Sequence, residues 1–151
     1  MLDKLLTLFR SPAGDAAPPS REPRLAVAAL LVEAAQMHEG FSAVERSTIE
    51  RLLADRFQLD PAETHRLIDS AKAEAERSTQ LFGFTSQVVR AFDEAERIEV
   101  IEMLWEVAYA DGRLDAHEDS LLRRVAGLIH VPDRARGDAR LRVLQRLGLE
   151  R

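Results

Sequence analysis

The sequence predicts an all-α protein, a bundle of about seven helices built from two pseudo-repeated helical units. Three observations lead to this fold class. Hydrophobic residues make up 46% of the 151 residues but aromatic residues only 5%, so the apolar content is mostly leucine, alanine, valine and isoleucine. Leucine and alanine are strong helix formers, whereas aromatic and β-branched residues favour strands. Apolar residues also recur at helical spacing, and capping patterns precede several of these segments.

The first part of the chain is expected to lie outside the helical domain. Residues 1–10 predict a short amphipathic helix, because four large apolar residues share one helical face. Residues 11–23 predict a linker, since they contain four prolines, which lack an amide donor and disfavour helix at the residue before them. The helical domain is therefore predicted to cover residues 24–151. The four apolar residues of the first segment are Leu2, Leu5, Leu6 and Phe9.

Two helices open the domain. Residues 24–38 are apolar over most of their length apart from Glu33, so this helix should be central and buried on most sides. The second helix is predicted over residues 42–57. It begins with Ser42 and Glu45, the spacing of a capping box in which a hydroxyl and a carboxylate satisfy free amides of the first turn.

The middle of the chain predicts a third helix over residues 60–78, where Asp60 supplies an N-cap and a proline follows at the first helical position. A break is expected at residues 81–84, which contain a glycine. A short helix should then cover residues 85–92.

Three more helices are predicted in the second half. Residues 93–110 begin with another capping pattern and leave only a narrow polar stripe, so this helix should be the second central one. The last two helices should cover residues 116–130 and 134–147. The predicted core includes Leu30, Leu31, Leu104 and Trp105.

An internal repeat relates the two halves at an offset of 73 positions. Each half reads as a buried helix, a short polar turn, a capped helix, a break and another helix, which suggests a pseudo-two-fold arrangement. The matched pairs are Glu33 with Glu106, Ala35 with Ala108, Ser42 with Asp115, Glu45 with Glu118 and Ser47 with Ser120.

The turn before the sixth predicted helix carries the densest chemical signal. Asp111, Asp115 and Glu118 are spaced by four and three residues across a glycine, and Ca²⁺ or Mg²⁺ prefers carboxylate oxygens gathered in this way. The turn lacks the acidic spacing of an EF-hand. The same residues also form a capping pattern, and capping patterns outnumber metal loops of this length, so spacing alone favours capping.

The first-half counterpart of this turn is a weaker cation site. His38 replaces Asp111 and Ser42 replaces Asp115, while Glu45 corresponds to Glu118. Serine caps a helix as well as aspartate but is a poorer ligand for a hard cation. The candidate metal ligands are therefore Asp111, Asp115, Glu118 and Glu45.

Charges are unevenly distributed along the second half. Residues 93–119 hold ten acids and two bases, whereas the segment from residue 133 onward holds six arginines and three acids. A charge run is usually a solvated face, and this is the default expectation for both segments. The alternatives are that the basic tail covers the acidic segment or meets an anionic partner. Glu33 and Glu106, on the two central helices, are expected at helix edges in contact with water.

Several function classes find no support in the sequence. The absence of cysteine excludes disulfides, thiolate metal sites and cysteine nucleophiles, and no phosphate loop, Gly-x-Ser-x-Gly or HExxH motif occurs. The net charge of −5 argues against a nucleic-acid partner. No run of 18 apolar residues and no signal-peptide pattern occurs. We therefore expect a cytoplasmic protein that is not an enzyme.

Residues 104–118, which read LWEVAYADGRLDAHE, resemble the second repeat of the TerB (tellurite resistance B) family, typically Leu-Trp-x-Val-Ala-x-Ala-Asp-Gly-x-Leu-Asp-x-x-Glu. The likeness continues through residues 122–131, and residues 28–53 and 80–85 resemble the first repeat and the middle segment. The departures lie at His38 and Ser42, which puts a symmetric two-site metal arrangement in doubt.

The resemblance implies an all-helical bundle similar to the N-terminal domain of the DjlA co-chaperone. It also implies a role in tellurite resistance and related chemical stress, with protein partners, membrane-associated complexes at the inner face of the membrane, and metal binding. Two hypotheses stay open. One is a cation-responsive stress module that binds Ca²⁺ or Mg²⁺, and the other is a metal-free scaffold or co-chaperone-like adaptor. The sequence does not indicate the oligomeric state.

Overall fold

The computed structural model describes residues 21–37, 42–77, 81–114 and 116–149, and these residues form seven helices. Within these ranges no strand occurs. The all-α prediction and its number of helices are therefore confirmed. The predicted amphipathic helix at residues 1–10 lies outside the described residues. The helices are α2 (Arg21–Ala35), α3 (Ala43–Phe57), α4 (Pro61–Arg77), α5 (Phe82–Ala91), α6 (Glu94–Ala108), α7 (Ala116–Leu128) and α8 (Asp133–Leu147).

Local capping chemistry sets the starts of α4 and α6 as predicted. Asp60 Oδ1 accepts from the Glu63 amide at 2.8 Å, and the Asp60 amide donates to Glu63 Oε1 at 3.0 Å. The same reciprocal bonds join Asp93 and Glu96, both at 2.9 Å. Each pair satisfies amides that have no partner inside the helix, so these boundaries follow from residues three positions apart.

Two helices begin earlier than the sequence predicts. Helix α2 begins at Arg21 and includes Pro23, because a proline within the first turn loses no intrahelical hydrogen bond. The predicted break at residues 81–84 is wrong, since α5 begins at Phe82 and passes through Gly83. There the Thr85 hydroxyl donates to the Leu81 and Phe82 carbonyls, both at 3.2 Å, and holds the first turn.

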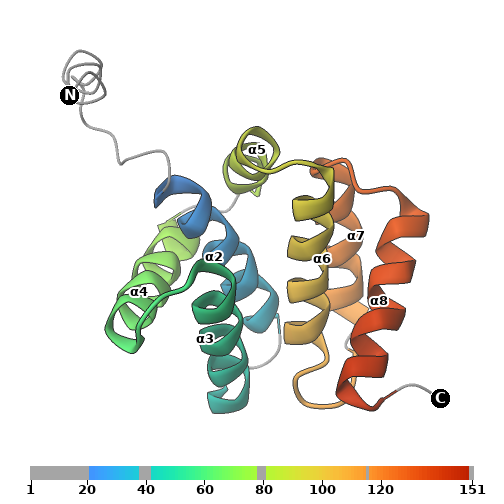
Figure 1. Cartoon of the computed structure of the whole chain (residues 1–151), viewed down its shortest axis with the longest axis horizontal. Coiled ribbons are helices and arrows are strands. Elements are labelled where there is room, and N and C mark those ends of the chain that lie inside the picture. Colours follow the sequence, from blue (N-terminus) through green and yellow to red (C-terminus); the bar gives the residue numbers. More distant parts are fainter. Residues whose placement is uncertain (1–20, 38–41, 78–80, 115, 150–151) are drawn as a thin grey trace.

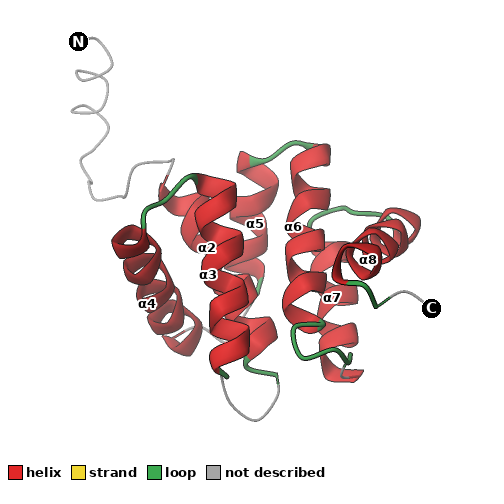
Figure 2. Ribbon diagram, turned by 60° about the horizontal axis from the view of Figure 1, so that its bottom comes forward, coloured by secondary structure: helices red, strands yellow, loops and turns green. Residues whose placement is uncertain are grey.

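The helices form two trios with α5 between them (Figure 1). Helices α2, α3 and α4 contact one another, and so do α6, α7 and α8. The two trios meet where α2 and α3 contact α6, and where α5 contacts both α2 and α7 (Figure 2). This arrangement matches the internal repeat, because the corresponding helices of each half make the corresponding contacts.

The core follows the two central helices. On α2 nearly every residue from Ala26 to Ala35 is buried, and on α6 the buried run extends from Val100 to Ala108 with one half-buried interruption at Glu102. The four predicted core residues, Leu30, Leu31, Leu104 and Trp105, are each at most 1% exposed.

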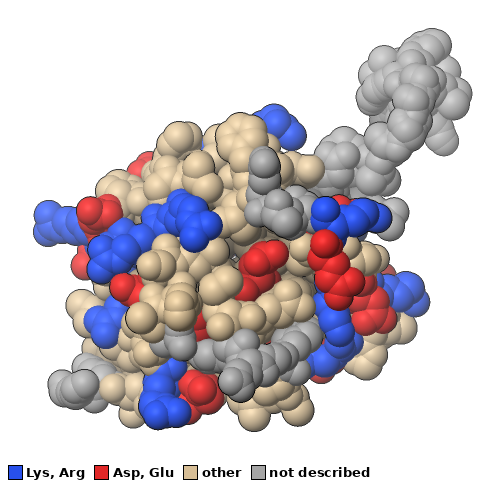
Figure 3. Space-filling model, turned by 180° about the vertical axis from the view of Figure 1, so that it is seen from behind, with Lys and Arg blue, Asp and Glu red and all other residues tan. Residues whose placement is uncertain are grey.

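The surface carries charges of both signs. On the face opposite to that of Figure 1, acidic and basic side chains lie interspersed (Figure 3). Within the described part of the chain, no helix has the length and apolar character needed to cross a membrane.

Candidate functional site

The turn between α6 and α7 is held by its own backbone. The Tyr109 amide donates to Trp105 O at 2.9 Å and ends α6, and the Gly112 amide then donates to Tyr109 O at 2.8 Å. Gly112 has φ +89, a backbone region that favours glycine. Asp111 is exposed, and its Oδ1 accepts from the Arg113 amide at 3.2 Å. Asp111 therefore stabilises the turn by an Asx-type hydrogen bond to the residue two positions on.

Two glutamates at matched positions of the repeat are buried at the starts of their helices. Glu45 in α3 is 3% exposed and Glu118 in α7 is 0% exposed. Glu45 Oε1 accepts from the Ser42 amide and from the Ser42 hydroxyl, both at 3.1 Å, and the Glu45 amide donates to Ser42 Oγ at 3.1 Å. The capping box predicted for α3 is therefore present, and it uses the carboxylate of one candidate metal ligand.

Replacing Ser42 by alanine should lower the free energy of unfolding by about 1 kcal/mol, since it removes the N-cap acceptor of α3. Urea denaturation measures the change. Ser47→Ala is the matched control, because Ser47 lies exposed on the same helix and should change stability by less than about 0.5 kcal/mol. Equal losses from the two variants would contradict a capping role for Ser42.

The structure describes three of the four predicted metal ligands, Asp111, Glu118 and Glu45, and does not group them into a metal site. Among residues 21–37, 42–77, 81–114 and 116–149, no group of three or more histidine, aspartate and glutamate side chains is placed to hold a metal ion. Asp115 lies outside the described residues, so the predicted set of Asp111, Asp115 and Glu118 stays a prediction. Glu45 belongs to the other trio of helices, in its capping box.

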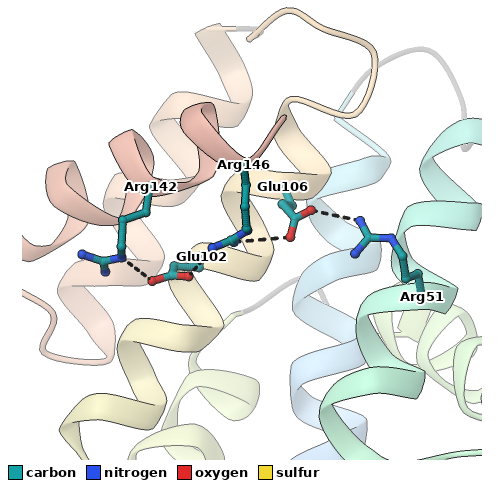
Figure 4. Close-up of polar contacts among 5 residues, drawn as sticks. All are labelled: Arg51, Glu102, Glu106, Arg142 and Arg146. Atoms are coloured by element: carbon teal, nitrogen blue, oxygen red, sulfur yellow. Dashed lines mark hydrogen bonds and ion pairs between the residues drawn. The ribbon is translucent and has the colours of Figure 1, made fainter. Parts of the chain in front are cut away.

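Glu106 corrects an expectation. It was expected at a helix edge in water, but its side chain is only 7% exposed. Glu106 Oε2 accepts from Arg51 Nη2 at 2.9 Å and Oε1 lies 3.4 Å from Arg146 Nη2 (Figure 4). In the polar stripe of α6, formed by Glu99, Glu102 and Glu106, Glu106 therefore faces α3 and α8, whereas Glu99 is exposed. A buried carboxylate is normally paired in this way, because an isolated charge away from water is costly.

The arginines of α8 cover the acidic stripe of α6. Glu102 accepts from Arg142 Nε at 2.8 Å and from Arg146 Nη1 at 3.2 Å (Figure 4). Together with the Glu106 contacts, these bonds join α3, α6 and α8 in one network. Two arginines of the basic tail, Arg142 and Arg146, therefore cover part of the acidic segment, at Glu102 and Glu106.

The network opens onto a hollow of about 200 Å³ beside the acidic turn. Its walls come from α3, the end of α6, the turn and the end of α8. One guanidinium group, that of Arg51, lines this space together with the buried Glu106 to which it is bound. The hollow is lined by Thr48, Arg51, Glu106, Tyr109, Ala110, Gly112, Leu147 and Leu149.

Glu33, the counterpart of Glu106, is half-buried rather than fully solvated. Burial raises the pKa of the Glu33 carboxyl above its ordinary value of 4.5, and the positive charge of Arg124 opposes part of this rise. The folded chain therefore binds the proton of Glu33 more readily than the unfolded chain does. The stability that this protonation contributes is fully present below pH 4.5 and is lost as the pH rises through the raised folded-state pKa.

Glu33→Gln should consequently be stabilised relative to the parent chain as the pH rises above 4.5, because glutamine carries no charge to bury. Urea denaturation of both proteins between about pH 4 and 7 checks this. Glu94→Gln, at an exposed glutamate of α6, is the control and should change the pH dependence little. A difference that is the same at every pH would contradict the assignment.

Sequence reasoning missed Arg51 and the individual roles of Arg142 and Arg146. The arginine-rich tail was a signal for α8, but the contact between Arg51 and Glu106 joins residues 55 positions apart and leaves no local pattern. The polar positions of α6 were a signal for ion pairs. On a helix that is packed against other helices, a buried carboxylate is normally paired with a base.

The comparisons with known proteins give one match. The model of the family described as Tellurite resistance protein TerB matches residues 24–141. This range covers α3 to α7 in full and all but the first turn of α2 and the end of α8. No curated protein matches the chain, and no solved structure does.

Proposed function

Because the chain belongs to the TerB family, we propose that it is a binding module of tellurite resistance and related chemical stress, which holds protein partners and carries out no catalytic step. Family membership rests on the match over residues 24–141. A fold alone does not define a function. The function of this chain depends on what its acidic site can do.

The observation that carries the proposal is that several carboxylates of this chain are already bound by other groups of the protein. Glu45 closes the capping box of α3, and Glu102 and Glu106 are bound by arginines of α3 and α8. Glu118 is completely buried in the first turn of α7. The carboxylates of Glu45, Glu102 and Glu106 serve the fold, which supports a metal-free scaffold or co-chaperone-like adaptor over a cation-driven module.

Cation binding is the second candidate. It would use Asp111, Asp115 and Glu118 as ligands for Ca²⁺ or Mg²⁺, with Glu45 at the equivalent position of the first half. The exposure of Asp111 on a turn beside a hollow favours it. Against it stands Arg51, which lines that hollow and whose positive charge repels a cation.

The surface charge supports protein partners over nucleic acid. The net charge is −5, and acidic and basic side chains alternate on the face of Figure 3. A nucleic-acid-binding domain usually carries a basic stripe that matches the phosphate backbone. We further propose that the partners include membrane-associated complexes, met from the cytoplasmic side.

Growth in the presence of tellurite tests this function. Removing the gene should lower the tellurite concentration that the cell tolerates, and the parent chain should restore it. Asp111→Asn should restore it equally, because asparagine can still accept the Arg113 amide while it removes the charge of a cation ligand. Unchanged tolerance without the gene would overturn the stress role, and failure of Asp111→Asn alone would favour the cation candidate.

A further inference from the structure

A groove of about 490 Å³ runs between the first turns of α2 and one face of α4. Three half-buried leucines, Leu25, Leu59 and Leu67, line it together with polar and charged side chains. Leu25 and Leu67 pack against the core on their inner side. The groove therefore presents apolar surface with a firm base, the kind of surface that receives large side chains of an amphipathic helix.

We propose that this groove is the docking site of the chain's own residues 2–9, which bind as a helical turn through Leu2, Leu5, Leu6 and Phe9. These four side chains recur at i, i+3, i+4 and i+7 and can face one surface together. A helix this short is not stable alone in water, since isolated helices below ~12–15 residues are marginal. The segment gains order only against a surface that buries its apolar face.

The connection between segment and groove favours this occupant. Leu25 forms part of the groove, so the chain enters the domain at the groove itself. The residues between Phe9 and Arg21, where α2 begins, form a tether with a reach of roughly 20 Å if it behaves as a flexible coil. A short flexible tether keeps the segment at an effective concentration on the order of 1 mM. A separate partner at micromolar concentration would need about a thousandfold higher affinity to compete.

Charge complementarity supports the same occupant. Of the acidic and basic side chains along the groove, Glu63 accepts from the Asp60 amide and Glu74 pairs with Arg77. Arg66 is exposed and makes no hydrogen bond or ion pair with any residue in the described ranges.

Asp3 is the only acid among residues 1–10. On a helix it neighbours Leu2 along the chain and Leu6 one turn on, so it lies at the edge of the apolar face. That edge meets the rim of the groove when the apolar face is docked. An ion pair between Asp3 and Arg66 would then set the orientation of the segment.

The chain contains no cysteine, so a single nitroxide label can be placed without background. Ser70 is exposed and lines the groove, which makes Ser70→Cys a suitable label site. In the full-length protein the label should broaden the amide signals of residues 2–9 in NMR spectra. Leu5→Asp combined with Leu6→Asp should recover these signals, because it removes the apolar face and leaves the tether intact.

Charge variants test the orientation without touching the core. Arg66→Glu should reduce the broadening, and adding Asp3→Arg should restore it. The reference label is Ser120→Cys, at an exposed position of α7 in the other trio, and its effect on residues 2–9 should not respond to either set of variants.

Three results would overturn the proposal. In the first, broadening from the Ser70 label is the same with and without Leu5→Asp and Leu6→Asp. In the second, broadening fades on dilution or passes from labelled to unlabelled molecules in a mixed sample, which would assign the groove to a second copy. In the third, residues 2–9 bind vesicles of phosphatidylcholine and phosphatidylglycerol, but without vesicles the Ser70 label does not broaden the amide signals of these residues. None of these results depends on whether the acidic turn binds a cation.

Discussion

Replacing Trp105 by alanine is expected to lower the free energy of unfolding by about 3–5 kcal/mol. The side chain is 1% exposed and lies in the last turn of α6. Its indole N–H donates to Arg136 O at 3.1 Å, and its ring stacks on Tyr109 with centroids 6.0 Å apart. Arg140 lies over the same ring at 5.9 Å. Alanine would leave a cavity and remove the contacts of this side chain with Arg136 and Arg140 of α8, and urea denaturation measures the loss.

Trp105→Phe separates packing from hydrogen bonding. Phenylalanine keeps an aromatic ring near Tyr109 and Arg140 but cannot donate to the Arg136 carbonyl, so it should cost clearly less than alanine. A loss below about 1 kcal/mol for Trp105→Ala would contradict the buried position of this residue.

Replacing both Arg51 and Arg146 by methionine is expected to cost about 3 kcal/mol, because it leaves the Glu106 carboxylate at 7% exposure without either cation. The cost lies at the low end of that for a stranded buried charge, since the two arginine side chains are themselves 52% and 47% exposed. Each single variant should lose less than half as much, because the other guanidinium still contacts Glu106.

Glu106→Gln provides the control for this network. In the background of the two methionines it should recover part of the stability, since a neutral amide is less costly to bury than an unpaired carboxylate. If the double variant loses less than about 1 kcal/mol, or if Glu106→Gln makes it still less stable, the network does not hold Glu106 as described.

The features that sequence predicts well here are local ones. The reciprocal bonds of Ser42 with Glu45 and of Asp93 with Glu96 join residues three positions apart, so their spacing alone indicates them. The buried faces of α2 and α6 likewise follow from their nearly continuous apolar runs. The start of α5 was predicted too late because Thr85, a residue with a side chain that can bond back to the preceding carbonyls, stabilises a first turn containing glycine.

The features that sequence did not predict are long-range. The charge of Glu106 suggested contact with water, but Arg51 and Arg146 reach it from two other helices. Which arginines pair with which glutamates depends on how α3 and α8 pack against α6, and periodicity carries no information on this. For the same reason α6 looks richer in available carboxylates in the sequence than it is in the fold.

A cation titration followed by NMR tests most directly whether the acidic segments serve the fold rather than a metal. Chelator-treated full-length protein is titrated with Ca²⁺ and, separately, with Mg²⁺, with Asp111→Asn measured alongside. The predicted result is that the amides around Asp111 and Glu118 show no saturable shift, and that both proteins respond alike. Saturable shifts confined to this turn, present in the parent chain and lost in Asp111→Asn, would contradict the metal-free account and establish the turn as a cation site.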